Sequence, residues 1–396
     1  MNHPKQYDAI IIGAGGAGLN LLLAMHTQGF LKENKVLVIE PSKNVSNNRT
    51  WCFWAKPEDT IVKAFNGILH HQWDFAKIEG HSKKFYPYRY YHLKGIDFYQ
   101  FVYHCLGNNA NVVWHPSAAE KVETKQQEAL VTTSTQDTFA APWVFDSRLN
   151  EQALSHTEQK NAIVWQSFFG YRIKTQTSKF DTQALSMMDF DVEQQNQCQF
   201  VYLLPFSNQE ALVELTRFGA ECLDSNKDEP LLREWILQRF GEFEIVENEV
   251  GRIPMSIQFN PDEAYHPTTN RLIPIGTAAG AVKSTTGYAF LNMFYHAFDI
   301  VKALQNKKPI PHPYHNIKFS FYDQLLLIIL KEKPHWGKEI FRTLFKKVAL
   351  NKILKFLNED TNVAEDLGIL TSLPKRYFLW ALSKKSKHVI QPHATR

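Results

Sequence analysis

The chain has 396 residues, of which 44% are hydrophobic and 21% charged, a length that predicts two domains with an additional lobe and a composition that excludes intrinsic disorder. Four cysteines without CxxC spacing and 16 histidines without HxH or HxxxH spacing argue against a disulfide framework and predict that no metal is bound, and no apolar run approaches the ~20 residues of a membrane-spanning helix. The net charge of +4 is unevenly distributed: residues 331–396 hold 14 Lys/Arg and 6 Asp/Glu, a net charge of +8, and the rest of the chain holds 30 Lys/Arg and 34 Asp/Glu, a net charge of −4. This asymmetry predicts an anionic partner, either nucleic acid or a membrane surface.

The first forty residues predict a β-α-β unit. Residues 8–13 are typical of a short buried strand, 15–30 of a helix, and 35–40 of a second buried strand. Such a unit predicts a parallel sheet. Because the first strand begins by Tyr7, the sequence leaves no room for a signal or transit peptide, and we expect a cytoplasmic protein.

The rest of the chain predicts further helices and strands. We expect helices at 96–106 and at 229–240, the second opened by Pro230 near its first turn. Residues 60–93 are irregular or β in pattern, and the chain turns helical and basic after Pro313. Strand patterns occupy residues 121–148, 162–175, 199–204, 211–218 and 271–275.

A glycine-rich loop separates the first strand from the first helix. Residues 13–18, Gly-Ala-Gly-Gly-Ala-Gly, fit the dinucleotide pattern GxGxxG, and Glu40 ends the next strand. Gly13 would make the tight turn, Gly15 would admit the pyrophosphate, and Gly18 would allow close packing of helix and strand. With Gly16, these glycines form a loop that leads into the predicted helix, and the N-terminus of that helix would hold phosphates. Glu40 would accept a ribose hydroxyl, which disfavours NADP at this site. The alternative is a packing turn in a nucleotide-free α/β domain.

A second glycine-rich segment favours FAD over NAD. Gly276-Thr277-Ala-Ala-Gly280 follows a predicted strand late in the chain. In flavoproteins with two dinucleotide folds, such a segment returns beside the first fold and meets the flavin. No second complete GxGxxG is present to hold a nicotinamide cofactor. We therefore expect Gly276, Thr277 and Gly280 to complete an FAD site.

Further segments, in order from residue 7 to about 300, resemble the flavin-dependent lycopene β-cyclase family of bacteria. They are Asn48-Arg-Thr-Trp51, Trp165-Gln-Ser-Phe168-Phe-Gly170, Val201-Tyr-Leu-Leu-Pro205, Glu214-Leu-Thr216, a glycine-x-x-proline turn at Gly251-Arg-Ile-Pro254, and Thr286-Gly-Tyr288 after the late loop. Thr277 stands where the related hydroxylases carry aspartate, and residues 145–148 match their aspartate-glycine motif only in part. Both departures count against a monooxygenase.

The resemblance implies an α/β fold: a Rossmann-like FAD-binding domain of the flavoprotein hydroxylase/geranylgeranyl reductase superfamily type, a mixed-β substrate domain and a C-terminal helical segment. The expected FAD-binding domain is discontinuous. The expected ranges are 1–65, 95–160 and 250–310 for that domain, 66–94 and 161–249 for the β-rich substrate domain, and 311–396 for the basic helical C-terminal region.

The implied reaction converts the linear ψ end groups of lycopene to β-ionone rings, giving γ- and β-carotene, without net redox change. The resemblance implies that FAD acts in its reduced form, with NAD(P)H as reductant. Protonating an isolated double bond requires a strong acid in a dry cavity, and aromatic faces stabilise the resulting cation. Six aromatic residues would line such a cavity or would be ordinary core residues: Trp51, Trp54, Phe168, Phe169, Tyr202 and Phe206. The alternatives are an FAD-dependent monooxygenase or prenyl reductase that consumes NAD(P)H, and a non-enzymatic FAD-binding carrier or sensor.

Glu214 is the candidate catalytic acid. It alternates with Leu212 and Thr216 on one strand face, and it matches the position of the family's acid, although related cyclases often carry a second acid beside it. A carboxyl group among apolar walls stays protonated at neutral pH. The alternatives are a solvated carboxylate, or an ion-pair partner of a base such as Arg172. Asp189 is a second nearby acid that we interpret as structural.

The basic tail contains one amphipathic helical pattern. Its apolar face comprises Ile340, Phe341, Leu344, Phe345 and Val348, and its basic residues lie off that face. Such a helix suits docking on an anionic membrane surface, from which a carotenoid substrate would enter. The alternative is a helix packed on its own protein. Nucleic acid is disfavoured because the aromatic residues lie on the apolar face and no familiar binding motif is present.

Overall fold

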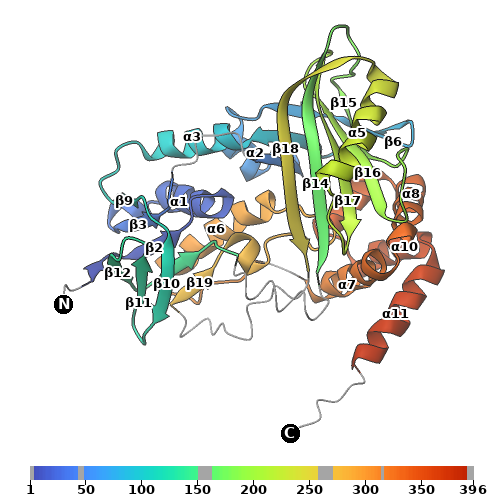
Figure 1. The fold of residues 1–396 in the computed structure, drawn as a ribbon. Coiled ribbons are helices and arrows are strands. Elements are labelled where there is room, and N and C mark those ends of the chain that lie inside the picture. The colour runs from blue at the N-terminus through green and yellow to red at the C-terminus, as the bar shows by residue number, and fades with distance from the viewer. Residues whose placement is uncertain (1–3, 43–48, 150–162, 257–270, 314–315, 390–396) are drawn as a thin grey trace.

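The predicted β-α-β unit is present in the computed structural model, which describes residues 4–42, 49–149, 163–256, 271–313 and 316–389 (Figure 1). Strands β2 (Ala9–Ile12) and β3 (Val36–Ile39) pair in parallel, and helix α1 (Gly16–Thr27) connects them. Every residue of both strands is buried, as expected for short apolar strands covered on both faces.

This unit lies at the centre of a parallel five-stranded sheet in the order β19-β13-β2-β3-β9. The other strands are β9 (Val112–His115), β13 (Val144–Asp146) and β19 (Leu272–Pro274). One face packs against α1 and two further helices, α3 (Gly95–Leu106) and α6 (Phe290–Gln305). The late strand β19 therefore returns to the first fold, as predicted.

The opposite face packs against a four-stranded sheet in the order β1-β12-β11-β10. Its strands are β1 (Lys5–Gln6), β10 (Ala119–Thr124), β11 (Ala129–Thr133) and β12 (Thr138–Ala141). The segment 60–93, predicted to be irregular or β, instead begins with helix α2 (Thr60–Phe65). It then contributes two strands to a small antiparallel sheet in the order β4-β8-β5. Its strands are β4 (Thr50–Ala55), β5 (His71–Trp73) and β8 (Arg89–Lys94).

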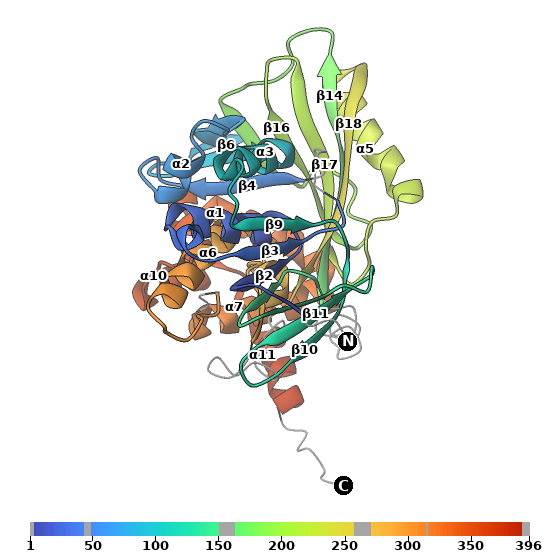
Figure 2. The same ribbon diagram turned by 90° about the vertical axis from the view of Figure 1, so that its left-hand side faces the viewer.

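A mixed seven-stranded sheet stands beside the parallel sheet (Figure 2). Its order is β18-β14-β17-β16-β15-β6-β7. The strands are β6 (Phe75–Ile78), β7 (His81–Lys84), β14 (Val164–Thr175), β15 (Ala184–Asp189), β16 (Cys198–Pro205), β17 (Glu210–Gly219) and β18 (Phe243–Met255). Helix α5 (Ser225–Phe240) covers one face through Leu232, Trp235 and Ile236.

Two further local predictions are wrong. The glycine-x-x-proline segment is not a turn but the end of strand β18, so the domain boundary expected at residue 250 falls inside that strand. Pro254 is tolerated there because β18 is an edge strand. Helix α5 begins at Ser225, where the Asp224 side chain accepts a hydrogen bond from the Asn226 N–H, and Pro230 lies inside the helix.

The C-terminal region is helical, as predicted, and covers the face of the large sheet opposite α5. The helices are α7 (Ile317–Glu332), α8 (Gly337–Lys347), α9 (Leu350–Leu357), α10 (Val363–Ser372) and α11 (Lys375–Val389). Four residues of the amphipathic pattern are buried: Ile340, Phe341, Phe345 and Val348. The apolar face of α8 therefore packs on the protein itself, and it cannot serve as the membrane-docking face. None of the helices in the described ranges is both long and apolar enough to cross a membrane.

Candidate active site

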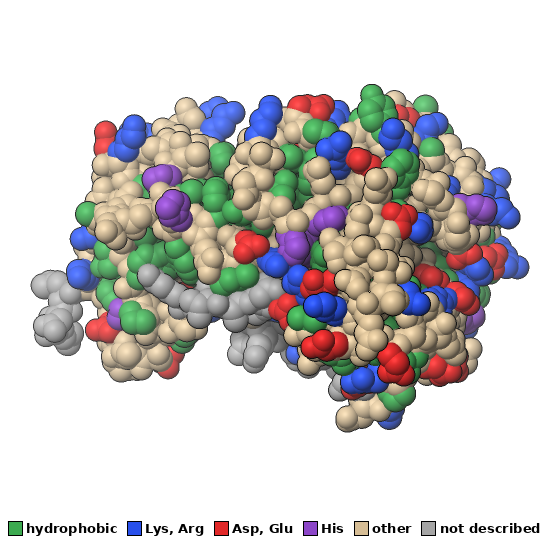
Figure 3. Space-filling view, turned by 90° about the horizontal axis from the view of Figure 1, so that it is seen from above, with side chains coloured by type: hydrophobic (Ala, Val, Ile, Leu, Met, Phe, Trp, Pro, Cys, Tyr) green, Lys and Arg blue, Asp and Glu red, His purple; other side chains and the backbone are tan. Residues whose placement is uncertain are grey.

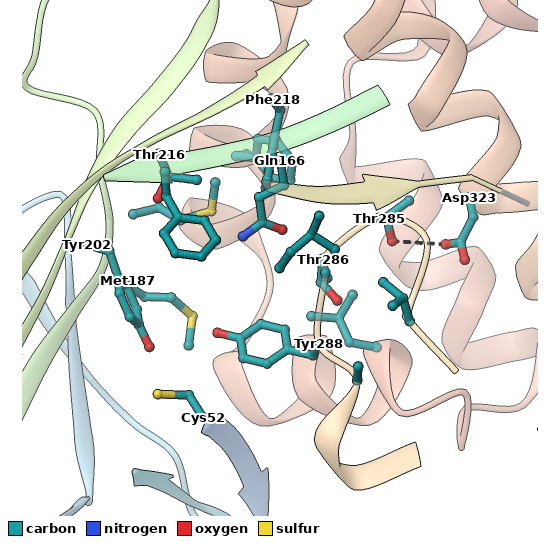
Figure 4. Close-up of a pocket in the computed structure, with 18 of the residues that line it drawn as sticks. Cys52, Gln166, Met187, Tyr202, Thr216, Phe218, Thr285, Thr286, Tyr288 and Asp323 are labelled. Atoms are coloured by element: carbon teal, nitrogen blue, oxygen red, sulfur yellow. Dashed lines mark hydrogen bonds between the residues drawn. The ribbon is translucent and has the colours of Figure 1, made fainter. Parts of the chain in front are cut away.

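A cavity of about 720 Å³ lies between the large sheet, strand β4, the late loop and the C-terminal helices (Figure 4). This volume is typical of small-molecule sites. Most of its wall is apolar or aromatic, and α8 contributes four of the five residues that the sequence suggested for membrane docking. Lining residues include Trp51, Trp54, Phe168, Met187, Phe218, Phe290, Ile340, Phe341, Leu344 and Phe345.

Four of the six predicted tunnel aromatics line this cavity: Trp51, Trp54, Phe168 and Tyr202. Phe169 instead lies in the core beneath α5, because neighbouring residues of a strand point to opposite faces. Phe206 stacks on His70, with ring centroids 4.9 Å apart, and is also outside the cavity wall.

One row of residues crosses four neighbouring strands at the middle of the cavity wall. In register, Glu249 of β18 faces Gly170 of β14, Gly170 faces Glu214 of β17, and Glu214 faces Tyr202 of β16. A Cβ atom on Gly170 would lie 2.5 Å from Cγ of Glu214. The Glu214 side chain therefore lies over the glycine, in space that any larger residue would fill.

Glu214 faces the cavity, as the strand alternation predicted, and is 7% exposed. Among the described residues, none forms a hydrogen bond with its carboxyl group. Burial and the nearby Glu249 carboxylate raise the pKa of Glu214 well above its usual value, because desolvation and like charge both disfavour ionisation. The alternatives predicted for Glu214, a solvated carboxylate or an ion-pair partner of Arg172, do not hold in the structure. Glu214 is buried, and Arg172 pairs with Glu210 and lies 3.9 Å from Glu247.

Glu249 is a second acid in the cavity wall that the sequence analysis missed. The Thr50 hydroxyl donates a 2.6 Å hydrogen bond to its Oε2 atom. Burial raises the pKa of Glu249, whereas the Thr50 hydrogen bond and the charge of Arg49 oppose that rise. The only signal in the sequence was the polar alternation of residues 243–253. Asp189, the other acid considered, lies 3.9 Å from Arg239, outside the cavity.

Three tyrosines, of which Tyr90 is buried and Tyr202 and Tyr288 are partly buried, form a hydroxyl cluster at one side of the cavity. The Tyr90 hydroxyl lies 2.5 Å from that of Tyr288 and also bonds to Tyr202. Figure 4 shows Tyr202, Tyr288 and Cys52 directed toward one another. Burial raises the pKa of all three phenols and of the Cys52 thiol, so these groups are neutral at physiological pH.

The predicted dinucleotide loop has the geometry that its glycines imply. Gly13 has φ +90°, and a Cβ on Gly18 would lie 2.0 Å from the Gly13 carbonyl oxygen, so helix and strand approach closely only without side chains. Among the described residues, no side chain caps the α1 N-terminus, and a Cβ on Gly15 would meet nothing within 4 Å. The Glu40 carboxylate accepts a 2.8 Å hydrogen bond from the Ala14 N–H. The loop thus leaves room for a phosphate group.

The late loop closes against this first loop. Its glycine Gly276 has φ +66°, and a Cβ there would lie 2.6 Å from Cβ of Ala17. Gly280 ends the 3₁₀ turn η3 (Gly276–Ala279) in the left-handed conformation, while Thr277 lines the cavity. One end of the cavity therefore reaches the loop that the sequence predicted to complete the cofactor site. A search of the described residues finds no cluster of His, Cys, Asp or Glu suited to a metal ion.

Comparison with known proteins gives the same family as the sequence motifs. The structure resembles a geranylgeranyl bacteriochlorophyll reductase-like protein from Thermoplasma acidophilum, with a TM-score of 0.55 at 14% identity over 98% of both chains. It also resembles a halogenase mutant solved in complex with FAD, with a TM-score of 0.51 at 13% identity over 98% of this chain and 93% of the other. These likenesses support the predicted fold class.

Sequence comparison is more specific. The chain is 25% identical over 297 residues to a lycopene β-cyclase from Pantoea ananas, covering 72% of this chain and 71% of that protein. The model of the family described as lycopene cyclase protein matches residues 8–382. Because that match spans nearly the whole chain, the protein belongs to the lycopene cyclase family.

Proposed function

We propose that the protein is a lycopene β-cyclase that closes the ψ end groups of lycopene to β-ionone rings, giving γ- and β-carotene. The observation that carries this proposal is the Glu214 carboxyl group, buried in an aromatic-walled cavity where desolvation and the Glu249 carboxylate raise its pKa well above the usual value. A neutral carboxylic acid in such a site is able to protonate an isolated double bond.

The cavity residues divide the task between them. Glu214 transfers its proton to the terminal double bond, which leaves a tertiary cation. The neighbouring double bond attacks the cation and closes the ring, and a ring proton then leaves. Trp51, Trp54 and Phe168 present aromatic surface to the cation, while the apolar wall excludes the water that would trap it.

FAD in its reduced form, with NAD(P)H as the reductant, is the proposed cofactor. The loop residues Gly13, Gly15, Gly16 and Gly18 would hold its pyrophosphate, Glu40 its ribose, and the late-loop residues Gly276, Thr277 and Gly280 its flavin end. The FAD reported in the structurally similar halogenase supports this choice. When bound there, reduced flavin would supply negative charge beside the cation and would not be consumed.

Peripheral association with the cytoplasmic side of a membrane is part of this proposal. Exposed apolar side chains lie on α7, α10 and α11: Ile317, Phe321, Val363, Leu367, Leu379 and Leu382. Leu370 and Phe378, which lie on α10 and α11 with some of these residues, also line the cavity. The basic region surrounding them complements an anionic lipid surface. On the face seen from above, basic and acidic side chains are interspersed (Figure 3), so their charges partly cancel and this face offers no uniformly basic surface to lipid.

The test is expression in a bacterial strain that accumulates lycopene, followed by pigment analysis and measurement of NAD(P)H consumption. We expect cyclic carotenes, a Glu214→Gln rate lower by about 10²–10⁴-fold, and no stoichiometric use of NAD(P)H. One NAD(P)H oxidised per product would instead indicate the monooxygenase or reductase alternative, and unchanged lycopene would indicate a carrier or sensor. Glu244→Gln is the matched control, because Glu244 is exposed on β18, whereas Glu210 is bonded to Arg172.

A further inference from the structure

Two carboxyl groups flank one glycine in the cavity wall. Gly170 pairs with Glu214 on one side and with Glu249 on the other. At the usual strand spacing, the two acid Cα atoms stand about 10 Å apart with no side chain between them. The Glu214 side chain leans over Gly170 and hence toward Glu249. Both acids line the same cavity.

The surroundings of the two acids differ in a way that separates their protonation states. Glu249 receives the Thr50 hydrogen bond and lies near Arg49, which both favour its ionised form. No described residue forms a hydrogen bond with the Glu214 carboxyl group, and burial and the negative charge of Glu249 disfavour its ionisation. Burial raises the pKa of both carboxyl groups, but the Thr50 hydrogen bond and Arg49 oppose that rise at Glu249. Surroundings that push two pKa values apart are the usual basis for assigning an acid and a base.

The other groups facing this pair do not reverse the assignment. On β4, β8, β16 and the segment between the late loop and α6, the facing groups are Cys52, Tyr90, Tyr202 and Tyr288, whose raised pKa values keep them neutral. Among the described lining residues, the two cations are Arg49, which precedes β4, and Arg252, which shares β18 with Glu249. The negative charge of Glu247 raises the pKa of Glu249 and is itself close to Arg172.

We propose that Glu214 and Glu249 are an acid–base pair that holds a single proton, with Glu214 as the donor that starts cyclisation and Glu249 as the acceptor that ends it. This assignment rests on the proposed cyclase function. The O–H bond of Glu214 breaks as a C–H bond forms at the terminal double bond. After ring closure, a C–H bond beside the ring cation breaks, its electron pair becomes the ring double bond, and its proton passes to Glu249. Return of that proton across Gly170 restores the pair, so no oxidant or reductant is consumed.

The experiment combines infrared titration with kinetics. The carbonyl stretch of protonated carboxyl groups is followed against pH in purified wild-type protein and in Glu214→Gln, Glu249→Gln, Glu249→Asp and the control Glu244→Gln. We expect the band of Glu214 to vanish in Glu214→Gln and to titrate at lower pH in Glu249→Gln, because the neighbouring negative charge is gone. Cyclisation by Glu249→Gln should fall by about 10²–10⁴-fold, with partial recovery in Glu249→Asp and no change in the control.

The outcomes distinguish failure of the proposed acid–base pair from failure of the cyclase function on which it rests. An unchanged Glu214 titration in Glu249→Gln would overturn the pair, and a normal cyclisation rate in that variant would overturn the acceptor role. Wild-type protein that leaves lycopene unchanged would overturn the cyclase function itself. That failure is distinguishable, because the titration is measured without substrate.

Discussion

Replacing Lys283 with methionine tests how the segment that follows the late loop is fixed to the C-terminal region. The Lys283 ammonium group lies 2.7 Å from Oδ2 of Asp323 and 2.9 Å from Oε1 of Glu359, and all three side chains are at most 9% exposed. Thr285 donates a further hydrogen bond to Asp323 (Figure 4), and the Asn316 N–H donates to Glu359. One cation thus compensates two buried carboxylates from different segments of the C-terminal region.

We expect Lys283→Met to lower the free energy of unfolding by about 3–5 kcal/mol at neutral pH, because it leaves buried charge without compensation. Methionine keeps most of the side-chain volume, and each carboxylate keeps one donor, so cavity formation adds little. Loss of the cation raises the folded-state pKa of both acids. An acid with a raised folded-state pKa makes the folded state less stable as pH rises. The deficit of the variant should therefore shrink as pH falls and the two acids become protonated.

Urea unfolding of the wild type and the variant at several pH values measures this deficit. The control is Lys77→Met, which removes a half-exposed ion pair with Asp181 and should cost about 0–1 kcal/mol. A Lys283→Met deficit no larger than that of the control, or one that does not depend on pH, would refute the role assigned to Lys283.

Three further outcomes follow from the site. Glu214→Gln should become more stable relative to wild type as pH rises through the folded pKa of Glu214, because each unit by which that pKa is raised costs the wild type about 1.4 kcal/mol once the group ionises. Thermal unfolding measures it, and a difference between the two proteins that does not change with pH would contradict the raised pKa. Gly15→Val should abolish FAD binding, because the backbone would no longer approach the pyrophosphate; flavin absorbance of the purified variant measures it, and full occupancy would show that the cofactor site is misplaced. Binding to anionic vesicles should weaken with salt, because each basic residue near the surface contributes about 1 kcal/mol that ions screen; sedimentation at low and high salt measures it, and a protein that stays in solution at low salt would remove the membrane from the proposal.

The secondary structure that sequence predicted best is local. The first β-α-β unit has the expected order because its apolar runs and glycine loop act over a few residues. Strand β18 was missed because its first eleven residues are at most half buried, with Glu247 and Glu249 on the half-buried face and Val246 and Val250 on the exposed one. Pro254 also suggests a turn unless the strand is known to be at an edge. That last fact depends on pairing with β14, some eighty residues earlier in the chain.

The amphipathic pattern of α8 shows a different limit. Ile340, Phe341 and Phe345 form one apolar face, and the pattern alone fits a bilayer or a protein interior equally well. The structure shows that this face packs against β16 and β17 and borders the cavity. The exposed apolar residues of α10 and α11 carry no comparable sequence signal, since their exposure depends on which faces the neighbouring helices cover.

The same reasoning explains why the proposed acid was found and its partner was not. Glu214 is visible in the sequence because its own strand alternates and its segment matches a family pattern. Glu249 becomes part of the site only through register, which places Gly170 between the two acids. With a larger residue at position 170, the same two glutamates would be separated by a side chain and would titrate more independently. The chemistry proposed for the cavity therefore depends as much on the residue that leaves space as on the residues that carry the proton.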